Sequence, residues 1–255
     1  MKKFIIYFLA LCPFFVFSQN KILASYLETG LKFQKNVILM IDGNHVKLSF
    51  GTPKLIEGEY ATKLQDDVYI SIISKPQETN NNWFVDLDSN RIKKSVFSKQ
   101  KHFKVIDNLP NYNWQITNEK DKFGEYEIIK ATTTFRGRNF IAWFAPSIPV
   151  TYGPWKLHGL PGLILKLYDE EKQFIWTLQS LNLNPQFEKT AFEMPVYPNE
   201  VEMTYKETLQ MLEKEQLEKQ KRQNTKLMGR GGRFEVKNNT DLRLEKVYEW
   251  EEEEK

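Results

Sequence analysis

The sequence predicts a mainly β domain, with a single antiparallel meander sheet that is strongly curved and can take the form of a half-barrel, followed by a C-terminal helix. From Asn20 to about Asn184, apolar and polar residues alternate with a period of two, and turn residues interrupt the alternation. Aromatic residues make up 14% of the chain, which is typical of strands. Short turns join the alternating segments, whereas parallel strands need crossovers of about a dozen residues or more. These observations favour consecutive antiparallel strands.

Turn chemistry sets the limits of nine predicted strands. The dipeptide Asp42-Gly43 supplies the positive φ angles of a tight hairpin turn. Pro146 and Pro149 end a strand, because proline has no N–H to donate to the ladder. The predicted strands are residues 37–41, 45–50, 83–87, 91–97, 114–117, 126–135, 139–145, 163–169 and 174–181.

A helix is predicted after the last strand. Thr204 and Glu207 have the spacing of a capping box, and apolar residues that follow share one helical face, so we expect a helix over about 204–222. Nearly every residue of 213–222 is charged or glutamine, which predicts a solvated second half.

Four regions follow from these patterns. Glycine and arginine at 229–233 are typical of a flexible linker, and the acidic run near the end is expected to be disordered. The regions are a signal peptide at 1–18, an antiparallel β domain at 19–200, a charged helical region at 201–228, and a flexible linker with an acidic tail at 229–255.

The first residues have the order of properties of a secretory signal. Lys2 and Lys3 precede an uncharged run at 4–17, which is too short for a membrane span of about 20 residues. Ser18 provides a small residue for cleavage, so the mature chain is expected to begin near Gln19. We therefore expect an exported protein of the periplasm or the outer-membrane periphery, or a secreted one.

Two alternatives to cleavage remain open. The apolar run could stay as an N-terminal anchor, or Cys12 could be acylated. Acylation of Cys12 fits the sequence poorly. Leu11 stands directly before Cys12, where a lipid-modification site has a small residue, and the apolar run continues past Cys12.

Charge and cysteine content limit the partners of the mature chain. Removal of Lys2 and Lys3 lowers the net charge from +3 to +1, and both signs are interspersed, so no basic surface for nucleic acid is predicted. Cys12 is the only cysteine, so the mature chain has no disulfide. No later apolar run is long enough for a transmembrane span.

The most unusual stretch is Tyr152 to Ile164. Its glycines accept positive φ angles and close backbone approach, while its prolines fix φ, as a sharp corner between two strands requires. Leu160 would then fill the core. The corner consists of Gly153, Pro154, Gly159, Leu160, Pro161, Gly162, Leu163 and Ile164.

Residues 159–164 spell GLPGLI, and with them the chain resembles the GLPGLI family of exported Bacteroidota proteins. The resemblance extends over about 130–184 and includes the strand that begins near Arg136. It implies export and a β-rich fold rather than a reaction.

Three residues near this corner are candidates for binding: Arg138, Trp155 and His158. Arg138 could hold an anion, and Trp155 and His158 could form the rim of a pocket. No two histidines have metal-ligand spacing, and the chain has no nucleophile elbow, phosphate loop or dinucleotide fingerprint. The sequence therefore assigns no catalytic residue, no metal and no cofactor.

Three functions remain open from the sequence. The first is a non-enzymatic envelope module that binds an apolar ligand or a partner protein. The second is a hydrolase or other enzyme that uses His158 with a nearby carboxylate. The third is a structural accessory of an envelope complex. A cavity beside Trp155 and His158 would favour the first, and a carboxylate beside His158 the second.

Overall fold

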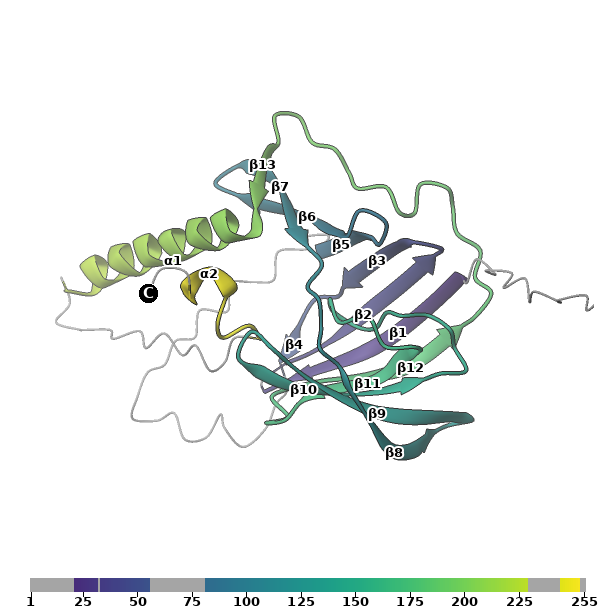
Figure 1. The fold of residues 1–255 in the computed structure, drawn as a ribbon. Helices are drawn as coiled ribbons and strands as arrows, with labels where there is room; N and C mark the ends of the chain where they lie inside the picture. Colours follow the sequence, from purple (N-terminus) through teal and green to yellow (C-terminus); the bar gives the residue numbers. More distant parts are fainter. Residues whose placement is uncertain (1–20, 32, 56–80, 229–243, 253–255) are drawn as a thin grey trace, which may run out of the picture.

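The computed structural model describes residues 21–31, 33–55, 81–228 and 244–252. The predicted signal peptide and the predicted linker at 229–233 lie outside these residues. The described strands form one open, mostly antiparallel sheet, and a long helix extends from one side of it (Figure 1). A mainly β domain with a C-terminal helix is thus confirmed.

Thirteen strands of the described residues belong to this sheet. Their order across it is β13-β7-β6-β5-β3-β2-β1-β12-β11-β10-β9-β8, and β4 pairs with β2 beside this path. The bounds are β1 Lys21–Gly30, β2 Phe33–Asp42, β3 His45–Phe50, β4 Lys54–Leu55, β5 Asn81–Asp86, β6 Arg91–Ser98, β7 Lys101–Asn108, β8 Gln115–Phe123, β9 Tyr126–Phe135, β10 Arg138–Ala145, β11 Leu163–Asp169, β12 Phe174–Asn182 and β13 Val201–Thr204.

The prediction of one uninterrupted antiparallel meander is wrong. The sheet consists of two meanders, β1 to β7 and β8 to β12, which join where β1 pairs with β12. Between them the chain crosses the sheet from the β7 edge to the β8 edge (Figure 1). At the β7 edge, β13 pairs with β7 in parallel, with Val201 opposite Phe103. Pairing of distant segments overrides the local turn pattern at these places.

All nine predicted strands are present, and β11 has the predicted bounds. Gly43, with φ of +58°, lies in the predicted turn between β2 and β3. The prediction missed β7, whose sequence KHFKVIDN is polar, and the short β4 and β13. It also gave no bounds for β1, which is the centre of the sheet. A strand near a sheet edge needs only weak apolar alternation, so sequence patterns detect it poorly.

One face of the sheet is buried. Along β1, buried residues alternate with partly exposed ones, and Tyr26 is fully buried. The same alternation in β2, β10 and β12 places a continuous apolar core on this face. A period of two along each strand therefore separates a covered face from a more exposed one.

The β10–β11 loop, residues 146–162, fills much of this core. Leu157 and Leu160 have no exposed surface, and Tyr152 and Trp155 are also buried. The Tyr26 hydroxyl donates a hydrogen bond to the Ile164 carbonyl oxygen across 2.9 Å, which ties the central strand to the end of the loop. The loop carrying the GLPGLI sequence is thus an interior part of the fold.

Glycine is required in this loop for close packing. A Cβ at Gly162 would lie 2.3 Å from the Ala145 carbonyl oxygen and 2.9 Å from Pro146 Cα. At Gly153 it would lie 2.7 Å from the Cβ of Ile164. Backbone atoms cannot rotate away as a long side chain can, so Gly162 is the stricter of the two positions.

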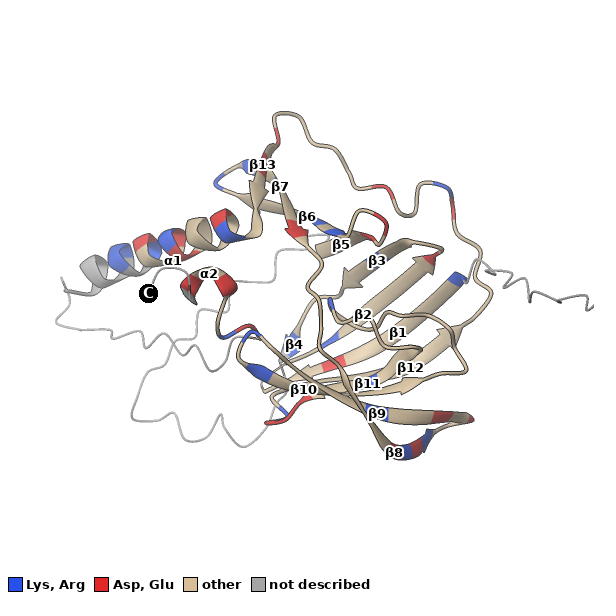
Figure 2. Ribbon diagram, viewed as in Figure 1, with Lys and Arg blue, Asp and Glu red and all other residues tan. Residues whose placement is uncertain are grey.

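The helix α1, Tyr205–Met228, begins one residue after the predicted start and extends past the predicted end. The predicted capping box is present: Glu207 Oε2 accepts from the backbone N–H and the hydroxyl of Thr204, both at 2.8 Å. Acidic and basic residues alternate along its outer part (Figure 2). This half still touches the β6–β7 turn, where Ser98 donates to Glu215. No helix of the described residues is both long and apolar enough to cross a membrane.

Residues 244–252 differ from the expectation of a flexible acidic tail. Glu245 and Tyr248 are buried, and Glu249–Glu252 form a short helix, α2, beside the sheet (Figure 1). The sequence pattern cannot show this, because an acidic segment is normally solvated unless buried cations receive it.

We expect Gly162→Ala to lower the free energy of unfolding by about 3 kcal/mol, because the new methyl group would overlap the backbone of Ala145 and Pro146. Gly43→Asn is the matched control: Gly43 lies in open space, and asparagine tolerates its positive φ, so the cost should stay within about 1 kcal/mol. Chemical denaturation measures both. Equal stability of the two variants would contradict a packed corner at Gly162.

Candidate functional site

An aromatic cavity of about 360 Å³ lies between the sheet, the β10–β11 loop, the start of α1 and the segment 244–248. This volume falls within the range of small-molecule sites. Seven parts of the chain converge here: four strands, the β10–β11 loop, α1 and the C-terminal segment. The lining residues are Glu28, Lys35, Phe50, Asn81, Trp83, Trp155, Tyr205, Leu244, Glu245 and Tyr248.

Half of the ten lining residues of this cavity are aromatic. Phe50 and Trp83 come from neighbouring strands, β3 and β5, and their ring centroids are 5.1 Å apart. Tyr205 meets Tyr248 edge to face at 6.3 Å. Such rings offer flat apolar surfaces with a polar atom at one end.

Polar groups at one side of the cavity are already paired. Glu28 is buried, accepts a hydrogen bond from Trp176 Nε1 at 2.9 Å, and lies 3.1 Å from the ammonium group of Lys35. Lys35 also lies over the ring of Phe50. This carboxylate is therefore held by its neighbours within the fold.

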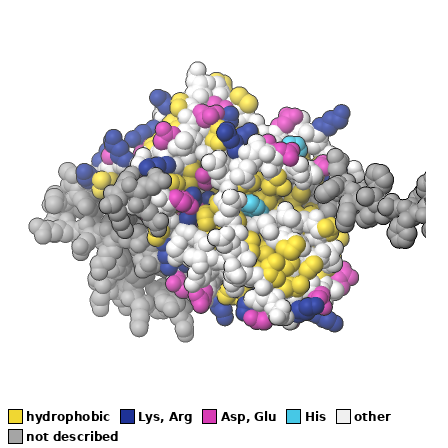
Figure 3. Space-filling model, viewed as in Figure 1, with side chains coloured by type: hydrophobic (Ala, Val, Ile, Leu, Met, Phe, Trp, Pro, Cys, Tyr) yellow, Lys and Arg dark blue, Asp and Glu magenta, His cyan; other side chains and the backbone are white. Residues whose placement is uncertain are grey.

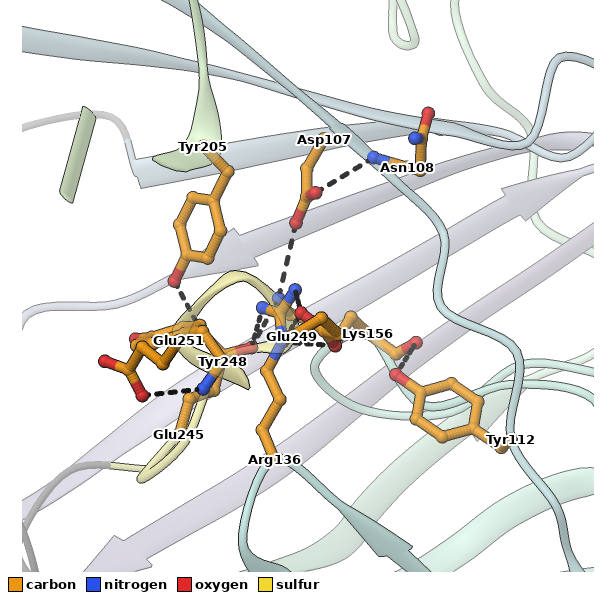
Figure 4. Close-up of polar contacts among 10 residues, drawn as sticks. All are labelled: Asp107, Asn108, Tyr112, Arg136, Lys156, Tyr205, Glu245, Tyr248, Glu249 and Glu251. Carbon is orange, nitrogen blue, oxygen red and sulfur yellow. Dashed lines mark hydrogen bonds and ion pairs between the residues drawn. The ribbon is translucent and has the colours of Figure 1, made fainter. Parts of the chain in front are cut away.

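Beside the cavity lies the Lys156 cluster, defined as Asp107, Arg136, Lys156, Tyr205 and Glu245, of which Tyr205 and Glu245 line the cavity (Figure 4). Glu245 Oε1 is 2.7 Å from both Lys156 Nζ and an Arg136 terminal nitrogen, and Tyr205 donates its hydroxyl to Glu245 Oε2. Lys156 is only 2% exposed. Asp107 lies farther from the ammonium group, at 3.7 Å.

Burial and charge act in opposite directions on the two acids of the cluster. Burial alone would raise the pKa of Glu245, but Lys156, Arg136 and the hydrogen bonds from Lys156 and Tyr205 hold it below its usual value. Burial raises the pKa of Asp107, and its cationic neighbours oppose this only in part. Glu245 is thus the carboxylate that keeps the cluster charged.

Lys94 on β6 is a further cation beside the cluster. It is the direct cross-strand partner of Trp83 on β5, and its ammonium group lies 5.2 Å from the Trp83 ring centroid and 4.7 Å from that of Tyr205. Burial, and then repulsion from Lys156, lower the pKa of Lys94 to about 8. No hydrogen bond or ion pair joins this ammonium group to another described residue.

Of the three predicted binding residues, only Trp155 lines the cavity. Its backbone has φ of +61°, and its ring packs among Phe135, Phe140 and Trp176. Trp155 is 5% exposed, so it forms a wall of the cavity rather than an exposed rim.

His158 lies outside the cavity lining. Its Nε2 is 3.0 Å from the Pro110 carbonyl oxygen, and its ring is flanked by Tyr112 and Tyr152. Burial lowers the pKa of His158, and the contact with Pro110 opposes this. Within the described part of the chain no carboxylate is bonded to His158, so the observation that would favour an enzyme using this pair is missing there.

Arg138 is buried beneath the β11–β12 turn. It pairs with Asp169 at 2.7 Å and donates to Gln173 Oε1 at 2.9 Å. Asp169 also accepts from the backbone N–H of Phe174 at 2.7 Å. These contacts join β10 to the turn, and they leave Arg138 far less available to an external anion than an exposed arginine would be.

Sequence reasoning missed most of the charged residues at and beside the cavity. Lys156 stands inside an otherwise apolar and glycine-rich motif, and this was the one signal that could have indicated a buried cation. Nothing local distinguishes Lys94 from other strand lysines, or Glu245 from the acids that follow it. Among the described residues, no group of three or more histidines, cysteines or acids could hold a metal ion.

Glu245→Gln should lower the free energy of unfolding by about 3 kcal/mol, because Lys156 and Arg136 would keep buried charges without their anion. Glu249 also pairs with Arg136, but its side chain is 60% exposed. Glu249→Gln should therefore change the free energy of unfolding by no more than about 0.5 kcal/mol. Urea denaturation at pH 7 compares the two. If Glu245→Gln leaves the free energy of unfolding unchanged, residues 244–252 do not dock against the rest of the fold.

Lys94→Met should raise the free energy of unfolding at pH 7 by about 1 to 3 kcal/mol, because it removes a partly buried charge that forms no ion pair with a described residue. The pKa of Lys94 is about 8 when folded and near 10.4 when unfolded, so the wild-type protein gains stability between these pH values. The advantage of the variant should therefore shrink as pH rises through this window. Lys93→Met, on the other face of β6, is the control. An advantage that is independent of pH would contradict the lowered pKa.

Comparisons with known proteins are limited in extent. A family model described as "Protein of unknown function (Porph_ging)" matches residues 136–166, from the start of β10 into β11, and so includes the GLPGLI sequence. No curated protein matches the chain.

Solved structures of PNGF-II, in the C2 and P21 space groups, resemble this fold. Both have a TM-score of 0.50, with 16% and 15% sequence identity. The alignments cover 75% and 76% of this chain but only 32% and 33% of PNGF-II, so the chain spans about a third of that protein's length. At this identity the similarity concerns the fold alone.

Proposed function

We propose that the protein is an exported, non-enzymatic binding module, and that its aromatic cavity receives a small ligand with a flat apolar face. The observation that carries this proposal is the cavity of about 360 Å³ with five aromatic rings in its lining. Ligand sites typically combine such apolar walls with a few convergent polar groups.

The state of the two carboxylates supports binding rather than catalysis. Glu28 is paired with Lys35 and bonded to Trp176, and Glu245 is paired with Lys156 and Arg136. A general base needs a carboxylate that can accept a proton from a substrate, which favours a raised pKa. The cations around Glu245 lower its pKa instead.

The outer surface is consistent with an apolar ligand taken up from solution. Figure 3 shows charged side chains around much of the outline, and hydrophobic side chains gathered on the face that carries the β10–β11 loop in this view. Export is supported by the signal-like residues 1–18 of the sequence.

Fluorescence of N-phenylnaphthylamine, a neutral aromatic probe, tests this function. We expect the probe to brighten on binding with a micromolar Kd, and Trp83→Leu to weaken binding about tenfold because a wall of the cavity is lost. Phe97→Ala is the control, since Phe97 is 46% exposed and lies outside the cavity lining. Absence of binding, or equal loss in both variants, would refute the proposal.

Protein for this experiment should come from the envelope fraction of the producing cell. Its intact mass should begin within about two residues of Gln19. A mass that retains Met1, or an acylated Cys12, would replace the cleaved form with an anchored one and leave the cavity experiment valid.

A further inference from the structure

Among the described residues, the charges beside the aromatic cavity do not balance. Lys94, Lys156 and Arg136 contribute three positive charges, and the partly buried Asp107 and the buried Glu245 contribute two negative ones. Glu249 adds a negative charge, but it is 60% exposed and faces Arg136. The excess positive charge therefore lies toward Lys94.

Two donors at this place have no acceptor in the part of the chain that the structure describes. The ammonium group of Lys94 lies within about 6 Å of the Trp83 and Tyr205 ring centroids, but no described carboxylate or carbonyl oxygen bonds to it. The Nε1 atom of Trp83 is buried and also has no hydrogen-bond partner among the described residues. Such unpaired donors carry a desolvation cost, and an acceptor from outside the chain would remove it.

The space beside these donors fits only a small group. A cavity of about 10 Å³ is lined by Trp83, Lys94, Asp107, Lys156 and Tyr205, together with Ile92 and Val105. A space of this volume holds about one water molecule. Trp83 and Tyr205 also line the larger aromatic cavity, so the two spaces share these walls.

We propose that Lys94 and the indole N–H of Trp83 receive an anionic oxygen, so that the ligand is an amphipathic anion, such as an aromatic carboxylate or sulfonate. Its apolar body occupies the aromatic cavity, and one oxygen of its acidic group reaches the small space. This inference rests on the proposed function and specifies the class of ligand for the same site. The anion would balance the excess charge and use both free donors.

A pair of probes that differ by one sulfonate group tests the proposal. Anilinonaphthalene sulfonate has the aromatic framework of N-phenylnaphthylamine with an added anion. At pH 7 we expect the sulfonate to bind about tenfold more tightly. Lys94→Met should reduce this ratio to about one while leaving the Kd of the neutral probe within about twofold, whereas Lys94→Arg should keep the preference.

The pH dependence gives an independent readout. Lys94 faces Lys156 from the loop, Asp107 from β7, Glu245 from the C-terminal segment and Tyr205 from α1. Because the pKa of Lys94 is about 8, raising the pH from about 7 to about 9.5 should remove most of the preference for the sulfonate. Near-ultraviolet circular dichroism checks that each variant keeps its packed core.

The outcomes separate this inference from the proposed function. Failure of the neutral probe to bind refutes the function itself. Binding of both probes with equal affinity overturns only the inference. A preference that survives in Lys94→Met also overturns it, while Lys93→Met, on the opposite face of β6, should leave the preference unchanged.

Discussion

The buried ammonium group of Lys156 is the constraint on which much of the structure depends. A charge that is only 2% exposed is tolerated when an anion and hydrogen bonds surround it. Glu245 provides that anion from 89 residues farther along the chain, and Tyr205 at the start of α1 bonds to the same carboxylate. One interaction thus holds the interior loop, the helix and the C-terminal segment together.

The loop that carries Lys156 can lie inside the sheet because its backbone approaches neighbouring strands unusually closely. Gly162 lies against the backbone at the end of β10, and Leu160 of the same loop is fully buried. Tyr112 and Trp114 of the crossing segment then donate hydrogen bonds to the carbonyl oxygens of Lys156 and His158. The crossover between the two meanders therefore covers the loop, which explains why the chain leaves the simple meander order here.

The sequence predicts those parts of this fold that local patterns encode. Turn glycines and alternation gave the strands from 126 to 181, and the capping box gave the start of α1. The joining of β1 to β12, the parallel pair of β13 and β7, and the docking of Glu245 depend on contacts between residues about 90 to 160 apart.

Trp155 was found because its motif is unusual. Lys94 and Trp83 acquire their role only from the three-dimensional arrangement, so no local signal points to them.

The placement of Lys94 is more readily explained by binding than by folding. Lys35, Arg138 and Lys156 each have a carboxylate within 4 Å, whereas no described carboxylate forms an ion pair with Lys94, whose ammonium group lies over two aromatic rings. A methionine would fill the same volume without a charge, and it would suit the rings of Trp83 and Tyr205 as well. A cation in this position therefore reduces stability, as residues of binding sites often do. When an acidic ligand binds, the charge of Lys94 that destabilises the empty cavity stabilises the complex.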